Sequence, residues 1–205
     1  MHLRIVLTLA TVALASAAFA QVAPDVFQVR YASNLNKGDS VINITNTGST
    51  DAPAATADNL CVNVYAFDPS EEIVSCCSCL VTPNALVSLS VQGDLISNTL
   101  SPSTPTAVVI KLVATDAGHG DVSVCNPAST EVELASGMRA WGTTLHALPG
   151  SPTTYGLTES IFLPGGLSLA ELNHLTSFCG FINSNGSGFG ICKSCRSGGL
   201  AGAKQ

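Results

Sequence analysis

The stretch TAVVIKLVAT, from Thr106 to Thr115, is the most apolar strand candidate in the chain. It is rich in β-branched Val and Ile, and Pro102 and Pro105 mark its start. A short, nearly continuous apolar run is typical of a strand that is buried on both faces. We therefore expect this segment to be a central strand of a sheet.

Further strand candidates lie on both sides of this run. Phe27, Val29 and Tyr31 alternate with polar residues, which is the period of two of a half-buried strand. Residues 48–59 and 116–130 are rich in small and polar residues, and we expect them to be loops. The other strand candidates are 27–31, 40–47, 61–67, 72–81, 87–91, 138–148 and 155–163.

About eight short strands separated by turn signals are typical of an antiparallel two-sheet fold. The sequence therefore predicts a mainly β protein, a β-sandwich that is either immunoglobulin-like or jelly-roll-like. A closed barrel is the remaining alternative.

One helix is expected near the C-terminus. Ser168 and Glu171 have the spacing of a capping box, and Asn185-Gly186 has the composition of a helix end. A Gly-rich stretch and then Cys192-Lys193-Ser194-Cys195 follow. Between the two ends, the apolar helical positions are Leu169, Leu172, Thr176, Cys179 and Ile182.

The N-terminal residues 1–20, MHLRIVLTLATVALASAAFA, have the pattern of an export signal. Arg4 precedes an apolar run, and Ala18 and Ala20 fit the small residues of a cleavage site. The mature chain is then expected to begin at Gln21. An uncleaved membrane anchor is the alternative, but the apolar run is short for a membrane span.

The mature chain is expected to be one domain outside the cytoplasm. We predict residues 21–165 as the sandwich and residues 166–205 as the helix and Cys-rich tail packed on the same domain. No second run of about 18 apolar residues occurs, so no membrane insertion is expected after signal removal. The expected location is secreted, extracellular or at the cell surface, with the periplasm as the alternative.

The composition excludes several classes of partner. Hydrophobic residues make up 46% of the 205 residues and charged residues only 11%. Removal of Arg4 leaves 7 Lys and Arg against 14 Asp and Glu, a mature net charge of −7. This acidic balance argues against binding nucleic acid or anionic lipid, and the apolar content argues against disorder.

The cysteines carry the most chemistry in this sequence. An even number in an exported chain predicts disulfides and no free thiol. If a hairpin turns at Asp68–Glu71, Cys61 lies nearly opposite Cys77, and Cys61–Cys77 is the expected bridge. Neighbouring strand residues point to opposite faces, so one of Cys76 and Cys79 is expected to reach the C-terminal segment. The eight candidates are Cys61, Cys76, Cys77, Cys79, Cys125, Cys179, Cys192 and Cys195.

The spacing of these cysteines is also compatible with two other uses. C-C-x-C together with C-x-x-C supplies enough thiols for zinc, and Cys192-x-x-Cys195 has the spacing of a redox site. An oxidising compartment favours disulfides instead, and no histidine lies in a ligand motif beside these cysteines. Haem attachment is excluded because Arg196 stands where histidine is needed. We therefore expect no metal and no cofactor.

Five motifs distinguish the chain: GDSVINITNTG, LCVNVYAF, SCCSC-x-VTPN, AWGTTLHA and CGFI-x-x-NGSGFGIC-x-x-C. In these motifs it resembles a group of uncharacterised exported bacterial proteins. The resemblance covers nearly the whole mature chain, and SCCSC and the GSGFGIC-x-x-C end are its most specific parts. It implies an exported, cysteine-bearing protein, and it supplies no activity, cofactor or binding residue.

Three functions are compatible with these features. A secreted structural or surface-assembly protein without catalysis, such as a filament or matrix subunit or an adhesin module, fits the strand-rich, charge-poor composition best. Its expected partner is a second copy of the chain. The alternative is an extracellular carbohydrate- or ligand-binding module with Trp141 and Tyr155 as stacking platforms. A secreted hydrolase using His119 and Asp121 comes third, because a polar loop histidine is the simpler interpretation.

The candidate assembly strand is the N-terminal segment that contains Val26, Phe27, Val29 and Tyr31. A terminal strand of this kind can add to the edge of a neighbour's sheet. The alternative is that it forms the first strand of its own sandwich.

Overall fold

The computed structural model of the chain describes residues 25–48 and 59–196. The predicted export signal, most of the predicted loop at 48–59 and the last nine residues lie outside the described residues. Within the described ranges no helix is long and apolar enough to cross a membrane.

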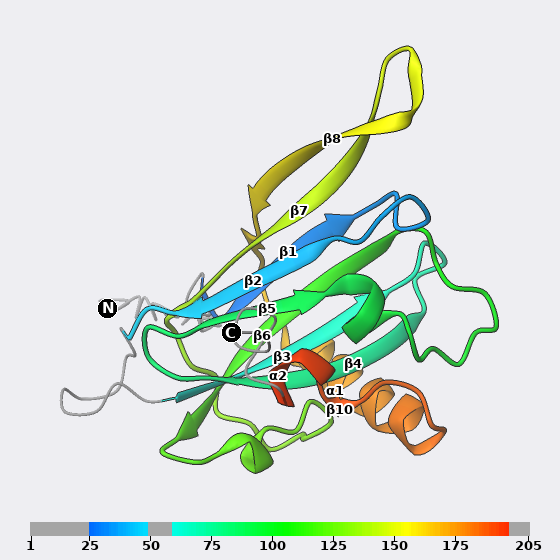
Figure 1. Cartoon of the computed structure of the whole chain (residues 1–205). Coiled ribbons are helices and arrows are strands. Elements are labelled where there is room, and N and C mark those ends of the chain that lie inside the picture. Colours follow the sequence, from blue (N-terminus) through cyan, green and yellow to red (C-terminus); the bar gives the residue numbers. More distant parts are fainter. Residues whose placement is uncertain (1–24, 49–58, 197–205) are drawn as a thin grey trace, which may run out of the picture.

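The described chain folds into two sheets packed face to face, as predicted (Figure 1). The six-stranded sheet has the order β10-β4-β3-β6-β1-β9, and the four-stranded sheet has the order β5-β2-β7-β8. The strands are β1 (Phe27–Ala32), β2 (Val41–Asn46), β3 (Asn59–Phe67), β4 (Ile73–Val81), β5 (Leu86–Ser90), β6 (Val108–Gly118), β7 (Met138–Leu148), β8 (Ser151–Ile161), β9 (Leu163–Pro164) and β10 (Gly190–Ile191).

The apolar run at 106–115 becomes β6, which lies between β3 and β1 in the six-stranded sheet. Ile110, Leu112 and Ala114 face the core between the sheets, and Val113 faces the opposite side. Burial on both faces explains why the run does not alternate between apolar and polar residues, and the prediction of a central strand is confirmed.

The helices are η1 (Val91–Leu95), η2 (Val122–Val124), α1 (Leu169–Ser184) and α2 (Lys193–Arg196). α1 is the predicted helix: the Ser168 side chain accepts a hydrogen bond from the Glu171 backbone N–H, and Asn185 follows its last turn. α2 is a single turn that the sequence did not indicate.

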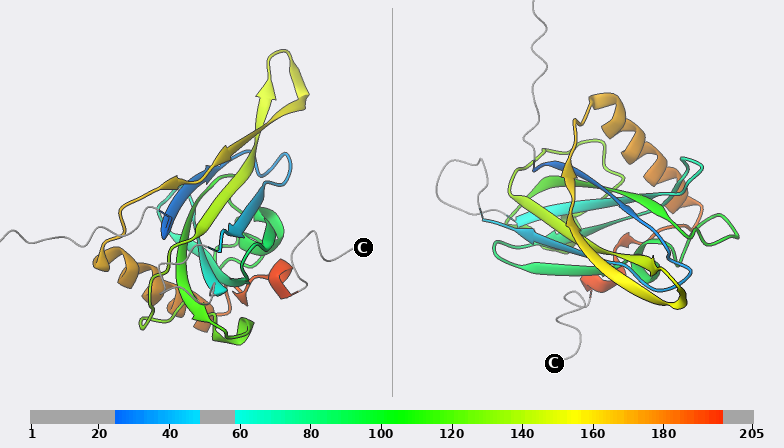
Figure 2. Two further views of the ribbon diagram at one scale, coloured as in Figure 1. Left: turned by 90° about the vertical axis from the view of Figure 1, so that its left-hand side faces the viewer. Right: turned by 90° about the horizontal axis from the view of Figure 1, so that it is seen from above.

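Two buried clusters hold these elements together. The larger fills the space between the sheets. In the smaller, α1 lies on the outer face of the six-stranded sheet, with Leu175, Cys179 and Ile182 packed against Tyr65 and Phe67 (Figure 2). Removing these apolar side chains from water is the main force that holds α1 on the sheet.

The hairpin of β7 and β8 is longer than predicted. Its strands extend to Leu148 and Ser151, so the expected turn over residues 149–154 shrinks to Pro149 and Gly150. Gly150 has a φ of 78°, a left-handed conformation that glycine adopts without steric cost, and it permits this tight reversal. The far half of the hairpin projects beyond the sandwich (Figure 1).

Candidate functional site

All eight cysteines form disulfides, as predicted, and none is free. The bridges are Cys61–Cys125, Cys76–Cys179, Cys77–Cys192 and Cys79–Cys195. Disulfides in this number belong to an oxidising, non-cytoplasmic environment.

The expected Cys61–Cys77 bridge is wrong. In the β3–β4 ladder Cys61 lies opposite Leu80, and Cys77 lies opposite Val64. The turn comes later than expected, since Phe67 pairs with Ile73 and an irregularity beside Phe67 shifts the register. Cys61 and Cys77 consequently face opposite sides of the sheet, because side chains alternate along a strand. Cys61 bonds instead to Cys125, 5.3 Å away between Cα atoms.

Cys76 and Cys77 do point to opposite faces of β4. Cys76 bonds to Cys179 of α1 on the outer face, whereas Cys77 belongs to the core between the sheets and bonds to Cys192. Both Cys76 and Cys79 reach the C-terminal segment, where only one of them was expected to do so.

The C-terminal segment therefore wraps around the β4 edge of the six-stranded sheet. α1 covers the outer face, β10 pairs in parallel with β4, and α2 contacts β4, η1 and β5. Asp94 of η1 fixes the last turn: its carboxylate accepts hydrogen bonds from the backbone N–H and hydroxyl of Ser194, at 2.7 and 2.6 Å, and from the N–H of Ser90. The segment closes the sandwich between β4 and β5.

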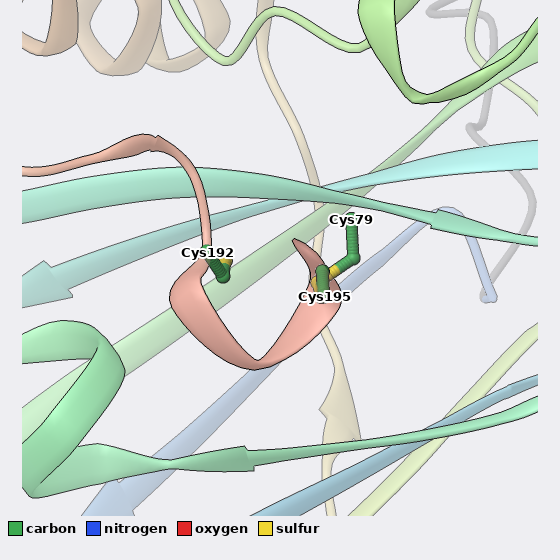
Figure 3. Close-up of side chains that lie close together, drawn as sticks. All are labelled: Cys79, Cys192 and Cys195. Carbon is green, nitrogen blue, oxygen red and sulfur yellow. A yellow bond between two sulfur atoms is a disulfide. The ribbon is translucent and has the colours of Figure 1, made fainter. Parts of the chain in front are cut away.

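The metal and redox hypotheses both concern one group of cysteines. The sulfurs of Cys79, Cys192 and Cys195 lie within 4.8 Å of one another (Figure 3). All three sulfurs are engaged in disulfides, whereas zinc requires thiolates. Cys192 and Cys195 bond to β4 and not to each other, so the C-x-x-C spacing here does not form the bridge of a thioredoxin-like site. Its role in this structure is to fasten the tail.

The hydrolase candidate Asp121 has a structural role. It is the N-cap of η2, and its Oδ1 accepts hydrogen bonds from the backbone N–H and the hydroxyl of Ser123 at 2.8 and 2.5 Å. These bonds lower the pKa of Asp121 because they stabilise the carboxylate form. His119, two residues earlier, lies in the same loop after β6.

The candidate assembly strand lies within its own sheet. Phe27, Val29 and Tyr31 belong to β1, which pairs with β6 along its whole length, and Phe27 is buried beneath α1. The backbone carbonyl of Val26 accepts a hydrogen bond from the N–H of Ala114. A donor role for this segment would require exchange of β1 between chains.

A different strand has an unpaired edge. β8 ends the four-stranded sheet, and in the described chain it pairs with β7 alone. The Phe162 N–H donates to the Ala140 carbonyl at 2.9 Å, so even-numbered residues at this end of β8 face β7. A second hydrogen bond, from the Thr47 N–H to the Gly137 carbonyl, leads to the same assignment. It shows that the odd-numbered residues of β7 direct their backbone groups toward β2, which leaves the even-numbered ones to pair with β8.

The odd-numbered residues of β8 therefore direct their backbone N–H and C=O groups away from the sheet. They include Leu157, Glu159 and Ile161. The sequence does not reveal this edge, because alternation indicates a strand and carries no information about its neighbours in the sheet.

The outer face of the same hairpin carries exposed apolar side chains. Leu157 and Ile161 are 70% and 66% exposed, and they lie directly opposite Leu145 and Trp141 of β7. Tyr155 shares this face because it is two residues from Leu157 along the strand. We call this set the hairpin strip: Trp141, Leu145, Tyr155, Leu157 and Ile161.

Arg30 of β1 joins the base of the hairpin to the six-stranded sheet. It is buried, and its guanidinium donates hydrogen bonds to the hydroxyls of Thr144 and Ser160 at 2.7 and 3.2 Å. Burial lowers the pKa of Arg30, and nearby Glu159 partly offsets this effect. The base of β8 is thus held in place while its far half extends into solvent.

A second apolar surface lies beside α1. Exposed Leu100, Phe178 and Phe181 border a groove of about 480 Å³, with Glu71 and Glu72 at its rim. The groove is lined in part by α1, and α1 and the tip of the β7–β8 hairpin lie at opposite ends of the described chain (Figure 1).

Comparison with known proteins adds no assignment, because no family model, no curated protein and no solved structure matches the chain.

Proposed function

We propose that the protein is an exported structural subunit that associates with copies of itself through the β7–β8 hairpin, in an extracellular or surface assembly. The observation that carries the proposal is the unpaired β8 edge beside the hairpin strip. Soluble monomers protect such edges with charges, prolines, bulges or covering segments. Among Tyr155–Ile161, Glu159 is the one charged residue.

The disulfides of the rest of the molecule are compatible with a durable structural protein outside the cell. Each of the four disulfides has at least one cysteine in β3 or β4, and three of them tie the C-terminal segment to β4. Cross-links of this kind each contribute on the order of 2–4 kcal/mol by restricting the unfolded chain. The second exposed surface beside α1 supplies a further contact, which an extended assembly needs in addition to the hairpin.

The proposal is tested on the purified, oxidised mature chain by light scattering over a range of concentrations and by electron microscopy. The wild-type protein is expected to form oligomers. Leu157→Lys with Ile161→Lys is expected to give monomers with unchanged thermal stability, because both side chains are already exposed. Val124→Lys, which changes an exposed apolar residue away from the hairpin, is the matched control and is expected to assemble. A wild-type chain that stays monomeric at every concentration contradicts the proposal.

Export is tested separately. Intact mass and N-terminal sequencing of protein recovered outside the cytoplasm are expected to show a chain that begins at Gln21. Recovery of the chain with residues 1–20 still attached would contradict the proposed signal.

Glycan binding is the second candidate, favoured by the common face of Trp141 and Tyr155. Tyr155 lies opposite Ala147, six residues along β7 from Trp141, which corresponds to about 20 Å. Two rings at that distance suit an extended polysaccharide better than a single sugar. Affinity electrophoresis in polysaccharide gels decides: retention of the wild-type chain that Trp141→Ala abolishes would favour this function.

A further inference from the structure

The unpaired edge of β8 defines the kind of partner that it accepts. The outward-facing residues Leu157, Glu159 and Ile161 offer backbone N–H and C=O groups at two-residue intervals. A second extended strand satisfies all of them at once, whereas a helix or a small molecule does not. The partner is therefore a β-strand with an unpaired edge of its own.

The chain itself supplies one such strand. In the described residues the sheets end at β5, β8, β9 and β10. β9 and β10 have two residues each, and β5 contacts α2 and η1. β8 has 11 residues and is the one long strand at a sheet end without such contacts. The strand of matching length is thus the β8 of another copy.

We propose that β8 pairs antiparallel with the β8 of a second copy, about a two-fold axis at Thr158, so that two four-stranded sheets become one of eight strands. This inference rests on the proposed function and names its partner and register. A two-fold contact uses the same surface on both copies, which is the commonest symmetry of soluble dimers.

The register follows from the regular part of β8. The ladder with β7 is unbroken from Tyr155 to Ile161, and its midpoint is Thr158. Pairing about Thr158 places Tyr155 opposite the second copy's Ile161, and Leu157 opposite the second copy's Glu159. A centre at Glu159 would instead set like charges directly opposite each other, which is destabilising.

This register also extends the hairpin strip across the joint. Its members Tyr155 and Ile161 meet twice, once on each side of the axis, and an aromatic side chain opposite a β-branched one is a favourable cross-strand pair. Leu157 and Glu159 lie between them, so the outward-facing backbone groups of these two residues are paired with the second copy. The two Thr158 residues face each other on the opposite side of the sheet, at a position without inter-copy hydrogen bonds.

That position makes a specific cross-link possible. Residues opposite each other in such a non-hydrogen-bonded pair have Cα atoms about 4.5 Å apart, within the range that a disulfide spans. Thr158→Cys is therefore expected to give a covalent dimer under mild oxidation. Thr153→Cys, an exposed threonine on the same strand, is the matched control and is expected to give none, because its own copy lies far from it in this register.

Each outcome has one meaning. Cross-linking of Thr158→Cys alone supports the two-fold joint, and peptide mapping checks that the four native disulfides persist. Cross-linking of both variants indicates parallel, in-register strands and overturns the two-fold arrangement, while self-association stands. If the wild-type chain assembles and neither variant cross-links, the β8 joint is wrong. A monomeric wild type refutes the proposed function itself.

A second variant tests the backbone contacts. Leu157→Pro removes an N–H that points away from β7, so the β7–β8 ladder keeps all its hydrogen bonds. Because the loss occurs on both copies, self-association is expected to weaken by about tenfold or more at unchanged thermal stability. Unchanged self-association of a folded Leu157→Pro chain would overturn the proposal.

Discussion

Asp94 and Arg30 are both buried, and the difference between their environments shows what each does. Asp94 accepts hydrogen bonds from two backbone N–H groups and one hydroxyl, and it thereby holds α2 against η1. Arg30 donates to two hydroxyls, but its Nη1 is buried without a hydrogen-bond partner in the described chain. Asp94 thus has hydrogen-bond donors for both carboxylate oxygens. Arg30 lacks a partner for one nitrogen, and the burial of that nitrogen costs desolvation free energy at the base of the hairpin.

Replacing Asp94 by Ala is expected to destabilise the protein by about 2–3 kcal/mol. The change leaves the N–H groups of Ser90 and Ser194 without their acceptor in a buried site. Chemical denaturation of the oxidised chain measures the loss. Glu131→Ala, which removes an exposed carboxylate, is the control and is expected to stay within about 0.5 kcal/mol of the wild type. Equal effects of the two changes would contradict the anchoring role.

Tyr65 is expected to make stability depend on pH under alkaline conditions. Its side chain is buried and its hydroxyl donates to the Pro127 carbonyl at 2.8 Å. Burial raises the pKa of Tyr65 above its ordinary value of about 10. The neutral Tyr65 side chain contributes its full share of the folding free energy at pH values below the ordinary tyrosine pKa of about 10. This stabilisation is lost as the pH rises above that pKa, because the tyrosine of the unfolded chain loses its proton before the buried one does.

Tyr65→Phe is the variant that isolates this effect. It is expected to be less stable than the wild type near pH 7, because the Pro127 carbonyl loses its donor, and to lose less stability between pH 9 and 11, a range about one unit either side of the free tyrosine value. Denaturant midpoints measured across this range decide. Parallel curves for the two proteins would show that Tyr65 does not govern the alkaline loss.

At the scale of elements, β4 organises the C-terminal segment of the chain from α1 to α2. Adjacent cysteines on one strand necessarily face opposite sides, so Cys76 and Cys77 fasten α1 on one face and the tail on the other. The S-x-x-E cap and the apolar positions of α1 were readable from the sequence, because they depend on neighbours three or four residues away. The sheet face that α1 covers depends on the pairing of Cys76 with Cys179, which are 103 residues apart.

Removing the Cys76–Cys179 bridge is expected to loosen α1 selectively. Cys76→Ser with Cys179→Ser should cost about 2–5 kcal/mol, and amide hydrogen exchange should rise throughout α1 while β3 and β6 stay protected. Cys61→Ser with Cys125→Ser removes a bridge that does not involve α1 and serves as the control. Comparable acceleration of α1 exchange in both variants would mean that the Cys76–Cys179 bridge does not hold the helix.

The whole molecule has a cross-linked body and a projecting hairpin. All four disulfides lie in the body, and beyond its base the hairpin contacts little besides itself (Figure 1). The body accounts for durability. The hairpin presents the unpaired edge and the hairpin strip.

Limited proteolysis is expected to distinguish these parts. Chymotrypsin should cut the monomeric chain first in the hairpin, at Tyr155 or Leu157, because exposed and protruding segments are cleaved before compact ones. The same sites are expected to be protected in the assembled protein. First cleavage in the body, or equal hairpin cleavage in both states, would contradict assembly through the hairpin. Mass spectrometry of the early fragments makes the comparison.

The sequence by itself determined the local and the compositional properties of this protein. The period of two in β1, the apolar run of β6, the capping box of α1 and the even number of cysteines each indicate their structure through nearby residues or simple counts. They were enough to predict a disulfide-linked β-sandwich with a C-terminal helix.

Only the tertiary structure decided which cysteines pair and which strand is left unpaired at an edge. Cys61 does not lie opposite Cys77, because the turn between β3 and β4 comes later than expected and the ladder is irregular beside Phe67. A shift of one residue in register moves a side chain to the opposite face of the sheet. The alternating pattern of the β1 segment is compatible with an assembly strand, but β1 lies between β6 and β9, and the unpaired edge belongs to β8. Strand order is set by contacts between residues far apart in the chain, and the local alternation of apolar and polar residues carries no record of them.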